Sequence, residues 1–423
     1  MPDRRERPWR GRWAWCVNGL AAVLLLGWIL YAATGKNLFG SRAWPDSVVD
    51  YRILYDLSRQ VVHNQRYEPQ QIFPYPPSAV VLLFVTALPP FPVAAGVWLA
   101  LTILASVGTV VLGTSLVGLS NHPWRWSAAL AAFALMGYYI LWDLRSQNSN
   151  MVYTFLLVAA LASMRRGQDT LVGMLLAASI ALKLYPVLVL PYLWWIGKRR
   201  ACVAAMGFLL TFFAMLPLVF FGLDGMVSAY TSWIGQLRVL ASTINESDHA
   251  ILIALPFTLT KRLGADSPLV PWLAGAASAV WLGAVAACVL SGRPWRTSQA
   301  NGWDLAADCG ILALAPVVIS PYLEPYHATP ALLPILALVQ WATDSSRPAV
   351  PRMFVTVALG AGWLALKVSG VMGYRGAGVL VQMLLVALAL AAVRRMALSR
   401  AQSVAATSDC GGGDGSRPSR EVG

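Results

Sequence analysis

The sequence predicts an all-α polytopic membrane protein. Of the 423 residues, 57% are hydrophobic and only 12% are charged, and the mean hydropathy is +0.60. These values are far more apolar than those of globular domains. Apolar runs close to the length that spans a bilayer follow one another along nearly the whole chain. We therefore expect a single membrane domain, residues 13–397, with a basic cytoplasmic segment before it, residues 1–12, and a disordered cytoplasmic tail after it, residues 398–423.

The net charge of +13 is explained by membrane topology. Lysine and arginine stand mostly at the ends of apolar runs, and no basic patch interleaved with aromatic residues indicates a nucleic-acid partner. Five arginines precede the first apolar run, which predicts a cytoplasmic N-terminus. With that orientation, 20 of the 32 lysines and arginines lie on the cytoplasmic side. The five scattered cysteines form neither a disulfide framework nor a metal-binding set, and we expect no metal or cofactor.

The first elements follow from the order of apolar and polar stretches. Residues 13–33 lack a small-residue cleavage site and are expected to form an uncleaved span. Residues 44–77 are then an outer loop, in which residues 48–62 have the apolar spacing of a helix that lies along the membrane surface. Residues 78–88, enclosed by prolines, are too short to span easily and are expected to form a partial or bent element.

Eleven further apolar runs bring the expected number of spans to about twelve, within a range of 11–13. These runs are residues 92–117, 126–141, 148–163, 169–182, 184–197, 201–221, 268–290, 304–319, 328–342, 352–368 and 377–393. Residues 222–270 form a second long outer interval, in which residues 250–260 suit a re-entrant or surface helix. The tail after residue 400 is rich in glycine and serine, which predicts disorder.

Four polar clusters fall on the outer side in this topology, which indicates one shared site. They are Asp50 with Tyr51 and Tyr55, residues 143–150 with Gln147 and Asn148, Lys183 before Pro186, and residues 320–327 with Tyr322, Glu324 and His327. Each cluster also has a structural interpretation. Asp50 fits a solvated acid or a helix N-cap, and Gln147 and Asn148 fit caps of the next span. Lys183 fits a side chain that snorkels to the interface, and His327 fits a structural hydrogen-bonding role.

The motifs in these clusters point to a family. Asp50-Tyr51-Arg52-Ile53-Leu54-Tyr55 pairs an acid with aromatic residues in the first outer loop, and Tyr75-Pro76-Pro77 closes that loop. Gln147-Asn148 begins a span, and Lys183-Leu184-Tyr185-Pro186 ends one. With these motifs the chain resembles the polyprenol-phosphate-mannose-dependent mannosyltransferases of GT-C fold, glycosyltransferase family 87. It departs from them at Ser146, where the family usually has glycine, and at His327, where it often has an acid.

The resemblance implies a GT-C-type transmembrane bundle with a long first extracytoplasmic loop. It also implies transfer of a hexose, mannose in the family, from a polyprenyl-phosphate donor to a lipid or glycan acceptor, with inversion, at the outer face of the cell membrane. By this resemblance Asp50 is the catalytic base. Lys183, with Arg52 or Arg59, neutralises the donor phosphate. The rest of the substrate site is Tyr51, Tyr55, Gln147, Asn148, Tyr322, Glu324 and His327.

The alternative is a transporter or flippase of lipid-linked sugars. Such a protein should carry ionisable groups in mid-span and show internal repeat symmetry. Here the charges cluster at the span ends and no convincing repeat is found, which favours an enzyme. A purely structural membrane subunit would leave the motifs around Asp50 and Lys183 without a purpose.

Overall fold

The computed structural model describes residues 8–39, 49–64, 67, 75–120, 122, 124–243, 269–290, 302–319, 325–371 and 375–410. In these parts of the chain every regular element is helical and no strand occurs. The predicted all-α fold class is therefore confirmed.

The N-terminal helices agree with the expected layout. Helix α1, Pro8–Phe39, is followed by α2, Val49–Asn64, which corresponds to the expected surface helix. The short α3, Pro77–Leu82, and the 3-10 helix η1, Phe84–Ala87, form the expected broken element. Prolines explain both of its limits: Pro77 occupies the first turn of α3, where proline is tolerated, and Pro89 and Pro90 follow η1, where they stop the helix.

The later helices follow the apolar runs in order. They are α4 Phe91–Leu116, α5 Arg125–Leu135, α6 Gly137–Ser146, α7 Asn150–Arg165, α8 Asp169–Leu182, η2 Tyr185–Leu188, α9 Val189–Trp195, α10 Arg199–Leu210, η3 Thr211–Met215, α11 Leu216–Thr243, α13 Leu269–Leu290, α14 Gly302–Ile319, η4 Pro325–Ala331, α15 Leu332–Thr343, α16 Ala349–Val371 and α17 Arg375–Cys410. In the described residues, five helices are long and apolar enough to cross a membrane, or six if the bent pair α5 and α6 is one span. Several others are apolar but shorter, so the total of about twelve spans stays a prediction.

The run expected as one span at residues 126–141 is split into α5 and α6, which meet at an angle of 78°. The bend frees the backbone carbonyl of Leu135, which accepts a hydrogen bond from the Gln382 amide nitrogen at 3.2 Å. The Gln382 amide oxygen accepts one from the Tyr139 hydroxyl at 2.6 Å. Backbone groups inside a membrane protein must be satisfied internally, so α17 stabilises a bend that is distant in sequence.

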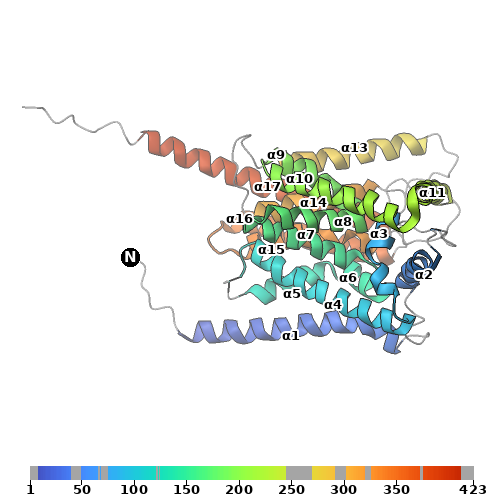
Figure 1. Cartoon of the computed structure of the whole chain (residues 1–423). Helices are drawn as coiled ribbons and strands as arrows, with labels where there is room; N and C mark the ends of the chain where they lie inside the picture. The colour runs from blue at the N-terminus through green and yellow to red at the C-terminus, as the bar shows by residue number, and fades with distance from the viewer. Residues whose placement is uncertain are drawn as a thin grey trace, which may run out of the picture.

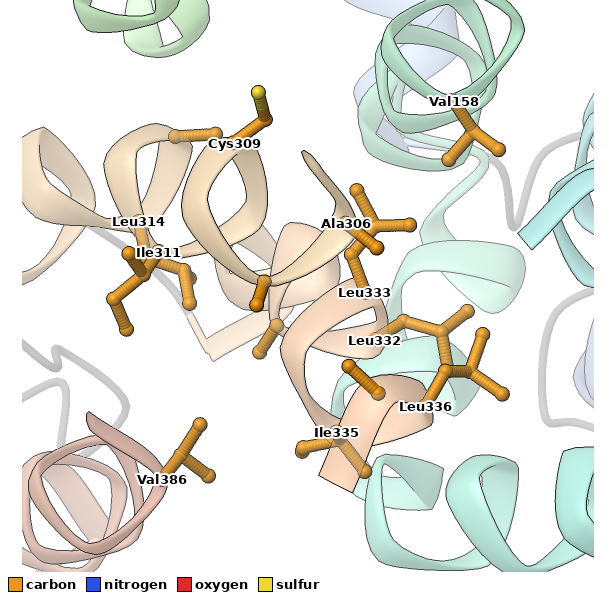
Figure 2. Close-up of a cluster of buried hydrophobic side chains, with 14 of the residues drawn as sticks. Val158, Ala306, Cys309, Ile311, Leu314, Leu332, Leu333, Ile335, Leu336 and Val386 are labelled. Atoms are coloured by element: carbon orange, nitrogen blue, oxygen red, sulfur yellow. The ribbon is translucent and has the colours of Figure 1, made fainter. Parts of the chain in front are cut away.

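The core is centred on α14 and α15. Figure 2 shows apolar side chains of these helices together with Val158 of α7 and Val386 of α17, all of them buried. Gly310 of α14 lies directly against Pro334 of α15, where a larger side chain would clash. Small residues let membrane helices approach closely, and this contact gives the bundle its dense centre.

The two ends of the bundle carry different parts of the chain. In Figure 1, the start of α1 and the end of α17 lie at one end, and α2 and α3 lie at the other. Helix α2, which carries the candidate residues that precede Pro90, therefore lies at the end of the bundle opposite the start of α1 and the end of α17.

Two expectations for the less apolar segments have different outcomes. Helix α17 continues to Cys410, although we expected disorder from residue 398. Residues 401–409 include three alanines, strong helix formers, and the helix ends just before the glycine run at residues 411–413. The expected re-entrant helix at residues 250–260 lies outside the described residues.

A buried ion pair joins α17 to α13 and α14. The Arg394 guanidinium contacts the Asp308 carboxylate, lies 3.5 Å from Asp304, and donates to the Cys288 carbonyl at 2.6 Å. Asp308 also accepts a hydrogen bond from the Tyr192 hydroxyl at 2.6 Å. Arg394 is 4% exposed and Asp308 is fully buried, so each charge depends on the other.

We therefore expect Arg394→Met to lower the free energy of unfolding in detergent by about 3–5 kcal/mol, because it leaves Asp308 buried without its cation. The control is Arg347→Met, which removes an exposed partner of Asp344 and should cost about 0–1 kcal/mol. Equal losses from the two variants, measured by chemical denaturation, would show that the buried pair does not stabilise the fold.

Candidate functional site

The site begins with the turn between α6 and α7. Helix α6 is capped at its C-terminal end by Gln147, whose backbone is left-handed with φ 54°, the one non-glycine positive φ in the described residues. That conformation costs about 1–2 kcal/mol for an ordinary residue. The Gln147 carbonyl accepts a hydrogen bond from the Trp98 indole at 2.8 Å, which helps to hold the turn. The Gln147 carboxamide is fully buried and makes no hydrogen bond to another described residue.

This turn presents Asn148, whose side chain joins three separate segments. Its Oδ1 atom accepts hydrogen bonds from the Tyr75 hydroxyl at 2.6 Å, the Lys183 ammonium at 3.0 Å and the Ser149 backbone N–H at 2.7 Å. Its Nδ2 atom donates to the Asp50 carboxylate at 3.1 Å. The start of α2, the segment before α3, and the end of α8 therefore meet at one carboxamide.

A second amide continues the connection to a second acid. The Asn150 Oδ1 atom accepts from Lys183 at 2.7 Å, and its Nδ2 atom donates to Asp143 at 2.6 Å. The other Asp143 oxygen accepts from the Met151 backbone N–H at 2.9 Å, at the first turn of α7. We call the series Asp143, Asn150, Lys183, Asn148 and Asp50 the polar chain.

The polar chain runs from the protein interior towards its surface. Asp143 and Asn150 are fully buried, Asn148 and Lys183 are 5% and 6% exposed, and Asp50 is half-buried. Of its two carboxylates, only that of Asp50 is thus open to an incoming molecule.

Tyr75 covers the centre of the polar chain. Its ring lies 4.9 Å from the Lys183 ammonium, a cation–π distance, and its hydroxyl accepts a hydrogen bond from the Ser149 hydroxyl at 3.1 Å. Burial raises the pKa of Tyr75, so the hydroxyl stays protonated and can donate to Asn148. Tyr75 therefore fixes both Lys183 and the acceptor side of Asn148.

The tyrosines of α2 hold this helix in place beside the polar chain. Tyr51 stacks on Trp98 with ring centroids 5.0 Å apart, and its hydroxyl donates to the Thr86 carbonyl. Burial raises the pKa of Tyr51 to about 12. The Tyr55 hydroxyl donates to the Pro89 carbonyl at 3.0 Å. Because Trp98 also binds Gln147, the same indole positions α2 and the α6–α7 turn.

The two arginines of α2 make other contacts. Arg52 pairs with Asp56 at 3.2 Å and lies over the Phe91 ring, and Arg59 donates to the Tyr55 hydroxyl at 2.9 Å. The structure thus gives Arg52, Arg59 and both tyrosines contacts that support α2.

His327 lies on η4, near the end of α8. Its carbonyl accepts a hydrogen bond from the Tyr153 hydroxyl at 3.0 Å. Its ring is 5.9 Å from that of Tyr185, two residues beyond Lys183, and 4.8 Å from that of Tyr326. His327 is therefore placed against the segment that follows Lys183. Tyr322 and Glu324 lie outside the described residues.

Sequence reasoning chose some members of this cluster and missed others. The structure brings Asp50, Asn148 and Lys183 into one hydrogen-bonded series, with Gln147 forming its turn. It adds Asp143, Asn150, Tyr75 and Ser149, which were not among the chosen site residues. The sequence carries a signal for these additions, because they lie in or beside the polar cluster at residues 143–150 and the Tyr75-Pro76-Pro77 motif.

The arrangement can accept a proton and oppose a negative charge. Asp50 offers a half-exposed carboxylate held by an amide donor, and Lys183 supplies a positive charge one amide away. In the described residues no three His, Cys, Asp or Glu side chains are grouped so that they could hold a metal ion. These are the parts that acid–base chemistry on an anionic substrate requires.

Comparisons with known proteins agree with this chemistry. The model of glycosyltransferase family 87 matches residues 73–321. A "Polyprenol-phosphate-mannose-dependent alpha-(1-2)-phosphatidylinositol pentamannoside mannosyltransferase" of Mycobacterium tuberculosis (strain CDC 1551 / Oshkosh) is 24% identical over 365 residues, which cover 83% of this chain and 78% of the relative. A protein of the same name from Mycolicibacterium smegmatis (strain ATCC 700084 / mc(2)155) is 26% identical over 356 residues, 82% of this chain and 78% of the relative. No solved structure matches the chain significantly.

The contacts of Asn148 lead to a stability prediction. Asn148→Leu keeps the approximate shape but removes the partner of Asp50, Lys183 and Tyr75 at once, so the free energy of unfolding should fall by about 2–4 kcal/mol. Ser149→Ala, which removes a single hydroxyl, should cost about 1 kcal/mol or less. Chemical denaturation in detergent measures both, and a loss in Asn148→Leu no larger than in Ser149→Ala would contradict the central position of this amide.

Proposed function

The chain belongs to glycosyltransferase family 87, and on that premise we propose that it moves a mannosyl group from a polyprenyl-phosphate-linked donor to a hydroxyl of a lipid or glycan acceptor at the polar chain. The matched region covers more than half of the sequence and contains Tyr75, residues 143–150 and Lys183. Both curated relatives are named as polyprenol-phosphate-mannose-dependent mannosyltransferases, which supports mannose and the lipid-linked donor.

The observation that carries the proposal is the half-exposed Asp50 carboxylate, oriented by Asn148 at the end of a buried series that contains Lys183. Asp50 takes the proton of the acceptor hydroxyl as the acceptor oxygen attacks the anomeric carbon. The bond from that carbon to the phosphate oxygen breaks in the same step, and polyprenyl phosphate leaves. A single displacement of this kind inverts the anomeric configuration.

The leaving phosphate is an anion that must approach a carboxylate. Lys183 opposes this repulsion, because it is the cation linked to Asp50 through one amide. Arg52 and Arg59 are engaged with Asp56 and with Tyr55, so the proposal gives them a lesser part in holding the phosphate. Gln147, whose buried carboxamide makes no hydrogen bond to the described part of the chain, and His327, beside Tyr185, complete the proposed substrate site.

We place this site at the outer face of the cell membrane. The basic segment at residues 1–12 favours a cytoplasmic N-terminus, and α2 lies at the bundle end opposite the start of α1. The proposed acceptor is a membrane lipid or glycan exposed at that face, since the named relatives act on a phosphatidylinositol mannoside.

The transporter alternative is not supported. The matching family and both relatives are glycosyltransferases. The polar chain, moreover, ends at the half-buried Asp50 carboxylate at one end of the bundle.

Replacement of the base tests the mechanism. Asp50→Asn keeps the shape of the side chain but cannot accept the proton, so turnover should fall by about two to four orders of magnitude. The measurement is transfer from labelled polyprenyl-phosphate mannose to a membrane lipid extract, with purified protein in liposomes. Asp56→Asn is the matched control on the same helix and should keep most of the activity, because Asp56 pairs with Arg52. Full activity in Asp50→Asn, or loss in Asp56→Asn alone, would show that the base is misassigned.

The orientation has its own test. In a background without the five native cysteines, an impermeant maleimide added to intact cells should label His63→Cys, at the exposed end of α2, and not Arg200→Cys, at the exposed start of α10. The reverse pattern would place the site on the cytoplasmic side. Permeabilised cells, in which both positions should react, serve as the control.

A further inference from the structure

We propose that Asp143 is a positioning residue for the transfer reaction: through Asn150 it holds Lys183 away from Asp50, so that the Asp50 carboxylate stays available as the base. This inference rests on the proposed function for the role of Asp50. Its geometric basis is the position of Asp143, whose carboxylate is fully buried and does not reach the protein surface.

The direction of each amide in the polar chain is dictated by its neighbours. An ammonium can only donate hydrogen bonds, and a carboxylate can only accept them. Asn148 and Asn150 must therefore both turn their oxygen atoms to Lys183, and their nitrogen atoms to Asp50 and Asp143. Rotating either amide by half a turn would place its NH₂ group against the ammonium and its oxygen against an acid. The series thus has one consistent arrangement.

Both Asp143 oxygens accept hydrogen bonds, as those of an ionised carboxylate do, so the charges in this series are two carboxylates and one ammonium. Direct pairing of Lys183 with either acid would be the strongest available contact in so buried a place. Instead, Lys183 binds two amide oxygens at 3.0 and 2.7 Å, and one amide separates it from each acid. Asp143 attracts the ammonium from the interior, while Asp50 attracts it from the surface. Both attractions act on Lys183, and the two amide oxygens hold it between the acids.

Loss of the inner charge would unbalance this arrangement. Without the anion at position 143, the polar chain would keep Asp50 as its single acid, and Lys183 would move towards it. A carboxylate in direct contact with an ammonium is a weaker proton acceptor, because the positive charge stabilises its ionised form. Turnover should therefore fall although Asp50 itself is unchanged.

The competing explanation is that Asp143 only caps helix α7 through its bond with the Met151 N–H. The variant Asp143→Asn distinguishes this capping role from the proposed positioning role. Its carboxamide oxygen can still accept the hydrogen bond from the Met151 N–H, but the negative charge is lost. A structural role predicts nearly normal turnover in this variant. The proposed role predicts a fall in kcat of about tenfold to a hundredfold, with the KM for the donor changed by less than about threefold.

Two double variants sharpen the test. In Asp143→Asn with Asn150→Asp the anion returns to the series and binds Lys183 from the inner side, so kcat should recover to within about fivefold of the native protein. In Asp50→Asn with Asp143→Asn, turnover should equal that of Asp50→Asn alone, because Asp143 acts through Asp50. Thermal unfolding in detergent checks that every variant is folded. No recovery in the exchange variant, or a further loss in the second pair, would overturn the proposal.

A structure of the Asp143→Asn variant gives a readout that does not depend on activity. The expected result is the Lys183 ammonium within about 4 Å of an Asp50 carboxylate oxygen, the limit for an ion pair. An ammonium still bound to both amide oxygens would overturn the positioning role even if transfer of mannose were established. Conversely, absence of transfer in the native protein combined with the shifted lysine would contradict the proposed function and leave the electrostatic arrangement supported.

Discussion

The site depends on the orientation of one side-chain amide. Asn148 receives three donors at its oxygen atom and gives one hydrogen bond to Asp50, so it connects α2, the Tyr75 segment, the α6–α7 turn and α8. Its position requires the left-handed backbone of the preceding Gln147 and the hydrogen bond from Trp98. The elements around it can be understood as supports that keep this carboxamide in one orientation.

The fold was largely predictable because membrane helices appear in the sequence as long apolar runs. Apolar runs and their bordering prolines predicted α2, the broken element at residues 77–87, and most later helices close to their observed limits. The bend between α5 and α6 could not be predicted, because it is stabilised by Gln382, whose position beside Leu135 is known only once α17 is packed. The helical segment up to Cys410 was missed because glycine and serine further along dominated the composition of the tail.

The candidate site was predictable in part. Asp50 and Lys183 stood out because they belong to polar clusters on the outer side of the expected topology, and the family resemblance gave them roles. The roles of Asp143 and Asn150 depend on which atoms face each other across the α6–α7 turn, seven residues apart. The Arg52 and Arg59 side chains illustrate the opposite case, since their proximity to Asp50 in sequence says nothing of their partners Asp56 and Tyr55. The spacing of residues in the sequence can therefore identify the segments that form the site, but only the three-dimensional contacts show which atoms bind each other.

The hydrogen bonds of Gln382 have an implication for modularity. The family-matched segment ends at residue 321, yet the bend that leads into α6, and thus to Asp143 and Asn148, is completed by a side chain of α17. Arg394 on the same helix neutralises Asp308 inside the matched segment. The family-matched segment is therefore not an autonomous unit that could be excised or transplanted. Any recombination between relatives that exchanges the last helix must exchange its polar partners in the bundle as well.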